Sequence, residues 1–218
     1  MRLLRDNSLT LILLLLFAIS LIGQWLAGWH FNNSELVRHH QSEIGPVAFL
    51  RDPLFLSSVF ENWESEFLQM SAYVMLTAVL MQRGSAESRD PDAPLRDGDL
   101  AKQARKAGAP AILRAGALWR WLYARSLGIV LFMLFGASFT LHLVYSAQAA
   151  AAEAAQHGDT AEPIHAYLFS AQLWFESFQN WQSEFLSTAV LIVLSIFLRQ
   201  RESPESKPVA APHSQTGA

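Results

Sequence analysis

The feature that most constrains this chain is a run of about 20 uncharged residues, LTLILLLLFAISLIGQWLAGW, from Leu9 to Trp29. A helix rises about 1.5 Å per residue, so this run is long enough to cross a hydrocarbon layer about 30 Å thick. A second full-length run extends from Ser126 to Tyr145, and shorter runs extend from Phe67 to Met81 and from Phe185 to Leu198. Each shorter run crosses only if its helix includes the preceding polar turn. On that basis the sequence predicts four transmembrane helices.

Composition disfavours a water-soluble enzyme. Of the 218 residues, 51% are hydrophobic and 16% are charged, whereas soluble domains carry about 25% charged residues. The absence of cysteine excludes disulfides, thiolate metal sites and a cysteine nucleophile. No G-x-S-x-G, Walker or zincin motif occurs. The sequence therefore predicts no catalytic residue, no cofactor and no metal ion, and an enzyme with a metal site among the outer histidines is the least favoured alternative.

The basic residues predict the orientation of the chain. If the amino terminus lies inside, only Arg38 and Arg51 among the 16 Lys and Arg residues fall in outer segments. Arg2 and Arg5 then precede the first helix on the inner side. Because positively charged loops stay in the cytoplasm, both termini are expected to be cytoplasmic.

An internal repeat runs through the chain. Residues 57–88 and 175–206 align at a constant offset of 118, with 14 of 32 positions identical. The centre of each copy is the motif Asn-Trp-[Glu/Gln]-Ser-Glu-Phe-Leu. Two helices per copy return the chain to its starting side, so the copies share one orientation and differ from the inverted repeats of many transporters. The two motifs are expected at equal depth, facing each other or the same surroundings.

The repeat predicts an all-α, integral-membrane four-helix bundle built from two parallel two-helix units. The first unit covers residues 1–83 and the second covers residues 119–201. A cytoplasmic basic linker, 84–118, joins them, and a disordered cytoplasmic tail, 202–218, follows.

The chain also resembles a known family. The paired N-W-[EQ]-S-E-F-L motifs, the Q-R-x-S-x-E-S segments after the second and fourth helices and the tail E-S-K-P-V-A-A-P-H are similar to a family of uncharacterised bacterial integral-membrane proteins. That family is classed as a domain of unknown function. The resemblance implies a multi-pass protein of the bacterial inner membrane, and it assigns no activity and no functional residue.

Polar residues of the motif fall on one face of each helix at about 100° per residue. They form the candidate polar or ion site: Asn62, Glu66 and Gln69 in the first copy, and Asn180, Glu184 and Ser187 in the second. An ionised side chain in the hydrocarbon costs several kcal/mol unless it is paired or hydrated. If Glu66 and Glu184 converge, they could form a proton or cation site.

A structural interpretation of the same motif is favoured over the ion site. Acids near the start of a helix complement its dipole, and Ser58-x-x-Glu61 has the spacing of a capping box. Trp63 and Trp181 are expected to anchor the helices at the headgroup level, where indole rings are enriched.

The expected partners follow from the inner linker and the helix surfaces. Lys102, Arg105, Lys106, Arg114 and Arg120 alternate with Leu and Trp residues, which favours binding to anionic lipid headgroups next to the bilayer. Acidic residues in the same loop disfavour nucleic acid. Small residues such as Gly23 and Gly128 allow close helix contact, either within one chain or in a homo-oligomer. No protein partner is indicated.

These observations predict a polytopic membrane protein, most readily a non-enzymatic structural, sensory or assembly component. A small ion or proton channel or transporter that uses Glu66 and Glu184 is the main alternative.

Overall fold

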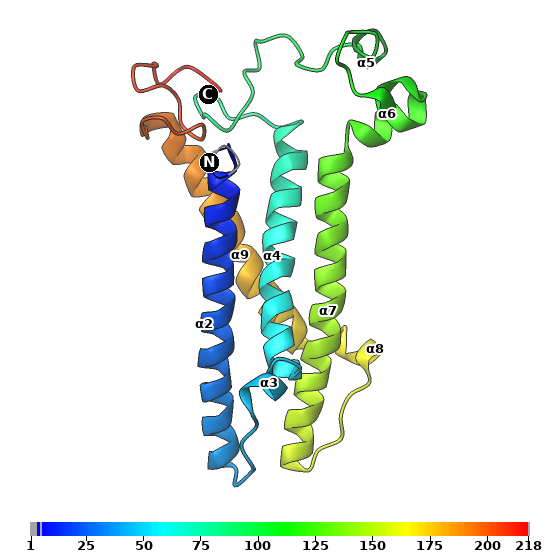
Figure 1. The fold of residues 1–218 in the computed structure, drawn as a ribbon, viewed down its shortest axis with the longest axis vertical. Helices are drawn as coiled ribbons and strands as arrows, with labels where there is room; N and C mark the ends of the chain where they lie inside the picture. Colours follow the sequence, from blue (N-terminus) through cyan, green and yellow to red (C-terminus); the bar gives the residue numbers. More distant parts are fainter. Residues whose placement is uncertain (1–3, 5, 218) are drawn as a thin grey trace. The chain divides into compact units, whose positions relative to one another are not determined.

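The computed structural model describes residue 4 and residues 6–217, and none of these lies in a strand. Arg2 and Arg5, which contribute to the predicted orientation, lie outside the described residues. The elements are α2 (Ser8–Arg38), α3 (Pro46–Phe49), α4 (Pro53–Thr77), α5 (Leu100–Gln103), the 3-10 helix η1 (Ala111–Arg114), α6 (Ala117–Tyr123), α7 (Ser126–His157), α8 (Ile164–Tyr167) and α9 (Ala171–Phe197) (Figure 1).

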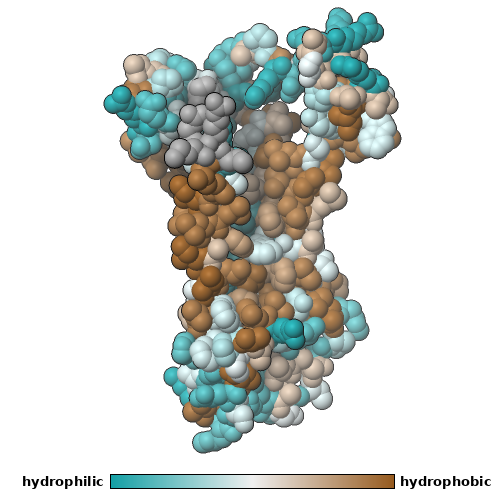
Figure 2. Space-filling view, viewed as in Figure 1, coloured by the Kyte–Doolittle hydropathy of each residue, from teal (hydrophilic) through white to brown (hydrophobic). Residues whose placement is uncertain are grey.

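Three of these helices, α2, α7 and α9, are long and apolar enough to cross a membrane. They contain 31, 32 and 27 residues. Their apolar side chains are largely exposed, among them Leu13, Phe132 and Val193. Figure 2 shows apolar side chains covering the amino-terminal half of α2 on the visible face. Contact between such apolar surfaces and water is unfavourable, so these surfaces fit contact with lipid.

The remaining long helix, α4, contains 25 residues and is not among these three. It corresponds to the predicted second span. Glu61, Glu64 and Glu66 fall in its middle, and three acids within a few residues interrupt the apolar stretch. Length therefore allows α4 to cross, but composition alone does not mark it as a span.

Elements of the first half recur in the second half at the spacing of the sequence repeat. α2 begins at Ser8 and α7 begins 118 residues later, at Ser126. The same spacing separates the starts of α3 and α8 and the starts of α4 and α9. The last pair also has equivalent caps, because Asp52 Oδ1 accepts a hydrogen bond from Leu54 N at 2.9 Å and Ser170 Oγ accepts one from Leu173 N at 3.2 Å.

The chain divides into two compact units, Met1–Val59 with His142–Tyr167, and Phe60–Leu141 with Leu168–Ala218. In the first unit, side chains of α2 fix the segment that returns toward α3. Trp25 Nε1 donates to Pro46 O at 2.9 Å, and Trp29 Nε1 donates to Ile44 O at 2.7 Å. Asn33 adds two hydrogen bonds to the backbone of Ile44. The last turns of α2 therefore contact the segment that follows them.

Equivalent positions of the two copies make equivalent contacts in this unit. A Cβ atom at Gly28 would lie 3.1 Å from the ring of Phe49, and the positions 118 residues later are Ser146 and Tyr167, whose hydroxyl groups are 2.7 Å apart. The first copy thus uses a close ring contact where the second uses a hydrogen bond.

The tail, which its composition predicts to be disordered, makes hydrogen bonds to the turn after α4. Lys207 is 1% exposed, and its Nζ donates to the carbonyl oxygens of Gly84, His213 and Gln215 at 2.5, 3.0 and 3.0 Å. Near the end of the tail, Gly217 N donates to Ser85 O at 2.9 Å. An ammonium group surrounded by carbonyl oxygens holds the tail against the turn that follows α4, so tail order depends on a contact far away in sequence.

Replacing Lys207 with methionine should release the tail. Met keeps most of the length but removes the ammonium group, and a hydrogen bond to a charged group contributes about 1.5–3 kcal/mol. Because 1.4 kcal/mol corresponds to a factor of about ten, amide hydrogen exchange over residues 208–217 is expected to accelerate at least tenfold. Lys102→Met is the matched control, because the Lys102 side chain is 87% exposed. Equal exchange in wild type and Lys207→Met would contradict this description of the tail.

Candidate functional site

The two copies of the motif meet in the second unit, where side chains of α4 and α9 form three hydrogen bonds. Asn180 Nδ2 donates to Glu61 Oε1 at 2.5 Å, and Trp181 Nε1 donates to Glu64 Oε1 at 2.8 Å. Gln69 Nε2 donates to Thr188 Oγ1 at 2.5 Å. The partners are 119, 117 and 119 residues apart. From one pair to the next, the residue numbers on α4 and on α9 increase together. The two helices therefore run in the same direction, in the register of the sequence repeat.

Glu64 explains why these hydrogen bonds matter. Its side chain is 0% exposed, and a buried carboxylate is costly unless it is hydrogen-bonded. The indole N–H of Trp181 is donor-only and can serve the carboxylate without needing an acceptor in return. Polar contacts of this kind between membrane helices contribute about 0.6–2 kcal/mol each. Glu61 and Glu64 of α4 therefore act as acceptors for donors on α9.

The capping box expected at Ser58 and Glu61 is wrong. α4 begins at Pro53, so both residues lie inside the helix. Ser58 Oγ donates to Phe55 O at 2.8 Å and accepts a hydrogen bond from Gln24 Nε2 at 3.1 Å. Asp52 caps the helix instead, followed by proline at the first helical position, where a missing N–H is harmless.

The predicted site residues fall into two groups. Gln69 and Asn180 take part in the α4–α9 hydrogen bonds, whereas Asn62 is exposed. Ser187 is exposed and donates to the carbonyl oxygen of Glu184, its own helix neighbour. The predicted polar face is therefore divided between the helix contact and the exterior.

Glu66 and Glu184 lie close enough for their charges to repel each other. Glu66 is exposed and Glu184 is half-buried. The structure thus brings the two predicted carboxylates near one another, beside the hydrogen bonds of Glu61 and Glu64 rather than within them.

Sequence reasoning missed Glu61, Glu64 and Thr188 as partners across the two helices. The signal was present in the differences between the copies. Positions 118 residues after the two acids hold Gln179 and Gln182, so carboxylates occur in one copy only. A repeat whose two copies differ in charge at two equivalent positions points to an asymmetric contact between the copies.

The tryptophans predicted as interface anchors also contact other residues. Trp181 packs against Phe178 with ring centroids 5.4 Å apart, and against Phe135 of α7 with centroids 6.2 Å apart. Trp63 packs edge-on against Phe60 at 5.5 Å. Trp181 therefore joins an aromatic cluster as well as donating to Glu64.

The segment after each of α4 and α9 forms the same turn, which explains the repeated Q-R-x-S-x-E-S pattern. Two serines fix it by accepting hydrogen bonds from backbone amides, and one residue has a left-handed backbone. In the first copy Gln82 N donates to Ser88 Oγ at 2.8 Å and Glu87 N donates to Ser85 Oγ at 3.1 Å, and Gly84 is left-handed with φ 83°. In the second copy Gln200 N donates to Ser206 Oγ at 2.9 Å and Glu205 N donates to Ser203 Oγ at 3.2 Å, and Glu202 is left-handed with φ 66°.

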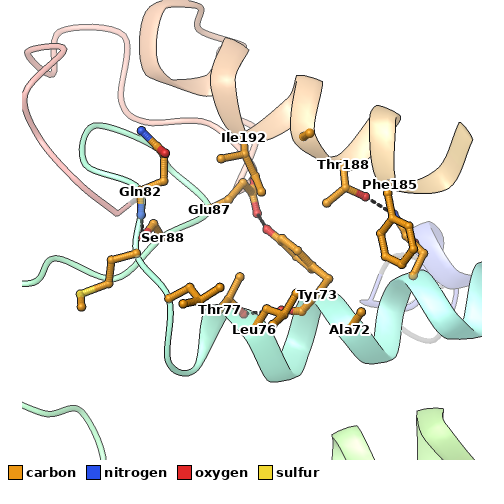
Figure 3. A pocket seen from close by; sticks show the side chains of 14 residues that line it. Ala72, Tyr73, Leu76, Thr77, Gln82, Glu87, Ser88, Phe185, Thr188 and Ile192 are labelled. Carbon is orange, nitrogen blue, oxygen red and sulfur yellow. Dashed lines mark hydrogen bonds between the residues drawn. The ribbon is translucent and has the colours of Figure 1, made fainter. Parts of the chain in front are cut away.

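A cavity of about 340 Å³ lies between α4, the first of these turns and α9 (Figure 3). Tyr73 Oη donates to Glu87 Oε2 at 2.5 Å at its edge. Burial raises the pKa of the Glu87 carboxyl above its usual range, and the nearby Glu205 carboxyl raises it further. The walls are otherwise mainly apolar, with Ala72, Leu76, Leu80, Met81, Phe185 and Ile192 among the lining residues.

Among the described residues, no group of three or more His, Asp or Glu side chains could hold a metal ion. Of the histidines predicted to lie on the outer side, His39 and His157 have their rings edge to face, with centroids 6.2 Å apart. They occupy equivalent positions of the two copies, and two rings alone do not make a metal site.

The family of the chain follows from comparison with known proteins. The chain matches, over residues 1–218, the family described as a domain of unknown function, DUF6766, and belongs to it. No curated protein and no solved structure matches the chain. The family therefore agrees with the expectation of a domain without an assigned activity, and arguments about function come from the site itself.

Replacing Trp181 with phenylalanine should destabilise the α4–α9 contact. The ring is kept, but Glu64 loses an N–H donor while remaining buried, which costs about 1.5–3 kcal/mol for a charged acceptor. The free energy of unfolding in mixed micelles measures this loss. In a Glu64→Leu background the same substitution is expected to cost less than about 1 kcal/mol, because no carboxylate is left to satisfy.

Trp119→Phe is the matched control for that experiment. Trp119 lies on α6 and is 51% exposed, so its change should stay within about 0.5 kcal/mol. A Trp181→Phe cost that is the same with and without Glu64 would show that the indole acts through packing alone.

Proposed function

We propose that this DUF6766 protein is a multi-pass protein of the bacterial inner membrane and a non-enzymatic structural, sensory or assembly component. In this proposal, the duplicated motif joins its two helical hairpins. The observation that carries it is the set of in-register hydrogen bonds between α4 and α9, in which Glu61 and Glu64 accept from Asn180 and Trp181. Residues that hydrogen-bond to each other across a helix contact stabilise the fold, which supports a structural role for the motif over a substrate-binding one.

The proposal treats α4 as a fourth span, in addition to α2, α7 and α9. Its 25 residues extend about 37 Å at 1.5 Å per residue, which is sufficient to cross. The acids that lower its hydropathy do not argue against crossing, because Glu64 is buried and both Glu61 and Glu64 have donors on α9. Acidic side chains in membrane helices are tolerated when they face protein partners in this way.

Four spans place both termini on one side, which the proposal assigns to the cytoplasm. Support comes from the basic residues, since only Arg38 and Arg51 of the 16 Lys and Arg residues would then face outward. Two parallel two-helix repeats also account for the recurrence of helix starts, caps and turns at a spacing of 118 residues.

Lipid headgroups are the proposed partner of the inner linker. On α6, Leu118, Trp119 and Trp121 are exposed, and the guanidinium of Arg125 lies 4.8 Å from the ring centre of Trp121. Exposed Trp and Leu beside Arg suit the boundary of an anionic leaflet, where each cation contributes about 1 kcal/mol. Nucleic acid is not a proposed partner.

An ion or proton pathway is the second candidate, and one observation favours it. Glu66 and Glu184 lie near each other and take no part in the hydrogen bonds of Glu61, Glu64 and Gln69 with α9. Two carboxylates that repel each other can share a proton or attract a cation. The first proposal is preferred because the other motif acids are already engaged in helix pairing.

Proton flux into proteoliposomes distinguishes the two candidates. The structural proposal predicts that wild type, the double variant Glu66→Gln with Glu184→Gln, and empty liposomes all show the same flux under a membrane potential. The matched control is Glu43→Gln with Glu162→Gln, which removes two acids that lie outside the long helices. Flux in wild type that disappears only in the Glu66→Gln, Glu184→Gln variant would overturn the structural proposal and establish the pathway.

A further inference from the structure

The cavity beside α4 and α9 combines an acidic side chain with a mainly apolar lining. Its lining residues, all within the described part of the chain, include Glu87 and no Lys, Arg or His. Glu87 also forms no ion pair with any described residue. A carboxyl group in such surroundings is disfavoured in its charged form unless a cation approaches it.

The Glu87 carboxyl has unused capacity to accept a hydrogen bond. Its Oε2 accepts from Tyr73 Oη at 2.5 Å, whereas its Oε1 is buried without a partner among the described atoms. The carboxyl of Glu205 from the tail repels the charged form of the Glu87 carboxyl. A positively charged donor beside the Glu87 carboxyl would offset the repulsion between the two carboxyl groups.

The remaining lining suits the body of such a ligand. Figure 3 shows Tyr73 and Leu76 on α4, Phe185 and Ile192 on the facing helix α9, and Glu87 at the Tyr73 hydroxyl. Aromatic faces attract cations, and aliphatic walls favour hydrocarbon. Pockets of about 300–1,000 Å³ accommodate small ligands, so a volume of about 340 Å³ admits a small one.

We propose that this cavity binds a lipophilic cation, with its ammonium group at Glu87 and its hydrocarbon part between α4 and α9. Charge selects the ligand class. An anionic amphiphile such as a fatty acid would place a second negative charge beside Glu87 and Glu205, and a neutral alcohol would leave their repulsion in place. This inference goes beyond the role of the motif in helix pairing, because the hydrogen bonds of Glu61 and Glu64 are not part of the cavity lining.

Calorimetric titration with n-octylammonium tests the proposal. The full chain is placed in nanodiscs of zwitterionic phosphatidylcholine at pH 8, and empty nanodiscs give the heat of partition into lipid. The expected result is saturable binding of one octylammonium per chain. Octanol is expected to bind at least tenfold more weakly, and octanoate is expected not to compete. Octanoate or octanol binding as tightly as octylammonium, or a titration equal to that of empty nanodiscs, would overturn the proposal.

Three variants separate the roles of charge and shape. Glu87→Gln keeps an acceptor for Tyr73 but removes the charge, and it should weaken octylammonium binding at least tenfold. Ala189→Trp keeps Glu87 but fills the cavity, since Ala189 is one of its lining residues, and it should abolish binding. Asp97→Asn removes one exposed acid outside the cavity and should bind like wild type. Unchanged affinity in both Glu87→Gln and Ala189→Trp, with helicity retained, would also overturn the proposal.

Discussion

A buried carboxylate that one helix presents and another helix satisfies is the interaction on which the second unit depends. Glu64 is fully buried on α4, and the indole N–H of Trp181 on α9 donates to it. Removing this donor takes one hydrogen bond from a buried carboxylate, whereas removing both partners leaves an apolar contact, so the pair contributes specificity more than stability. Two further hydrogen bonds, from Asn180 to Glu61 and from Gln69 to Thr188, join the same helices one or two turns away. Together the three bonds fix a single register between α4 and α9.

Duplication of one unit explains why this contact is asymmetric. In the second copy the positions equivalent to Glu61 and Glu64 hold the exposed residues Gln179 and Gln182, whereas the donors that reach α4 are Asn180 and Trp181. Gln179 and Gln182 keep the size and hydrogen-bonding capacity of the side chain without its charge. Elsewhere the copies remain equivalent, as the turns after α4 and α9 show through the same serine hydrogen bonds and the same left-handed position.

The sequence predicts the parts of this structure that depend on local pattern. Apolar runs located α2, α7 and α9, and the offset of 118 located matching helix starts, because helix formation and capping are decided by neighbouring residues. It did not predict which face of α4 meets α9, since a helical wheel groups residues such as Asn62, Glu66 and Gln69 without identifying the neighbour. Nor did composition reveal the contact of the tail with the turn after α4, where the ammonium group of Lys207 donates to the carbonyl oxygen of Gly84.

Paired cysteine cross-linking tests the shared direction and register of α4 and α9 most directly. The chain contains no cysteine, so each double variant carries only the introduced thiols. With a short bifunctional thiol reagent in membranes, Gln69→Cys with Thr188→Cys and Glu61→Cys with Asn180→Cys are expected to cross-link. The exchanged pairs, Glu61→Cys with Thr188→Cys and Gln69→Cys with Asn180→Cys, are expected to remain unlinked. Efficient cross-linking of the exchanged pairs and none of the first two would mean that the helices run in opposite directions, which contradicts the in-register pairing.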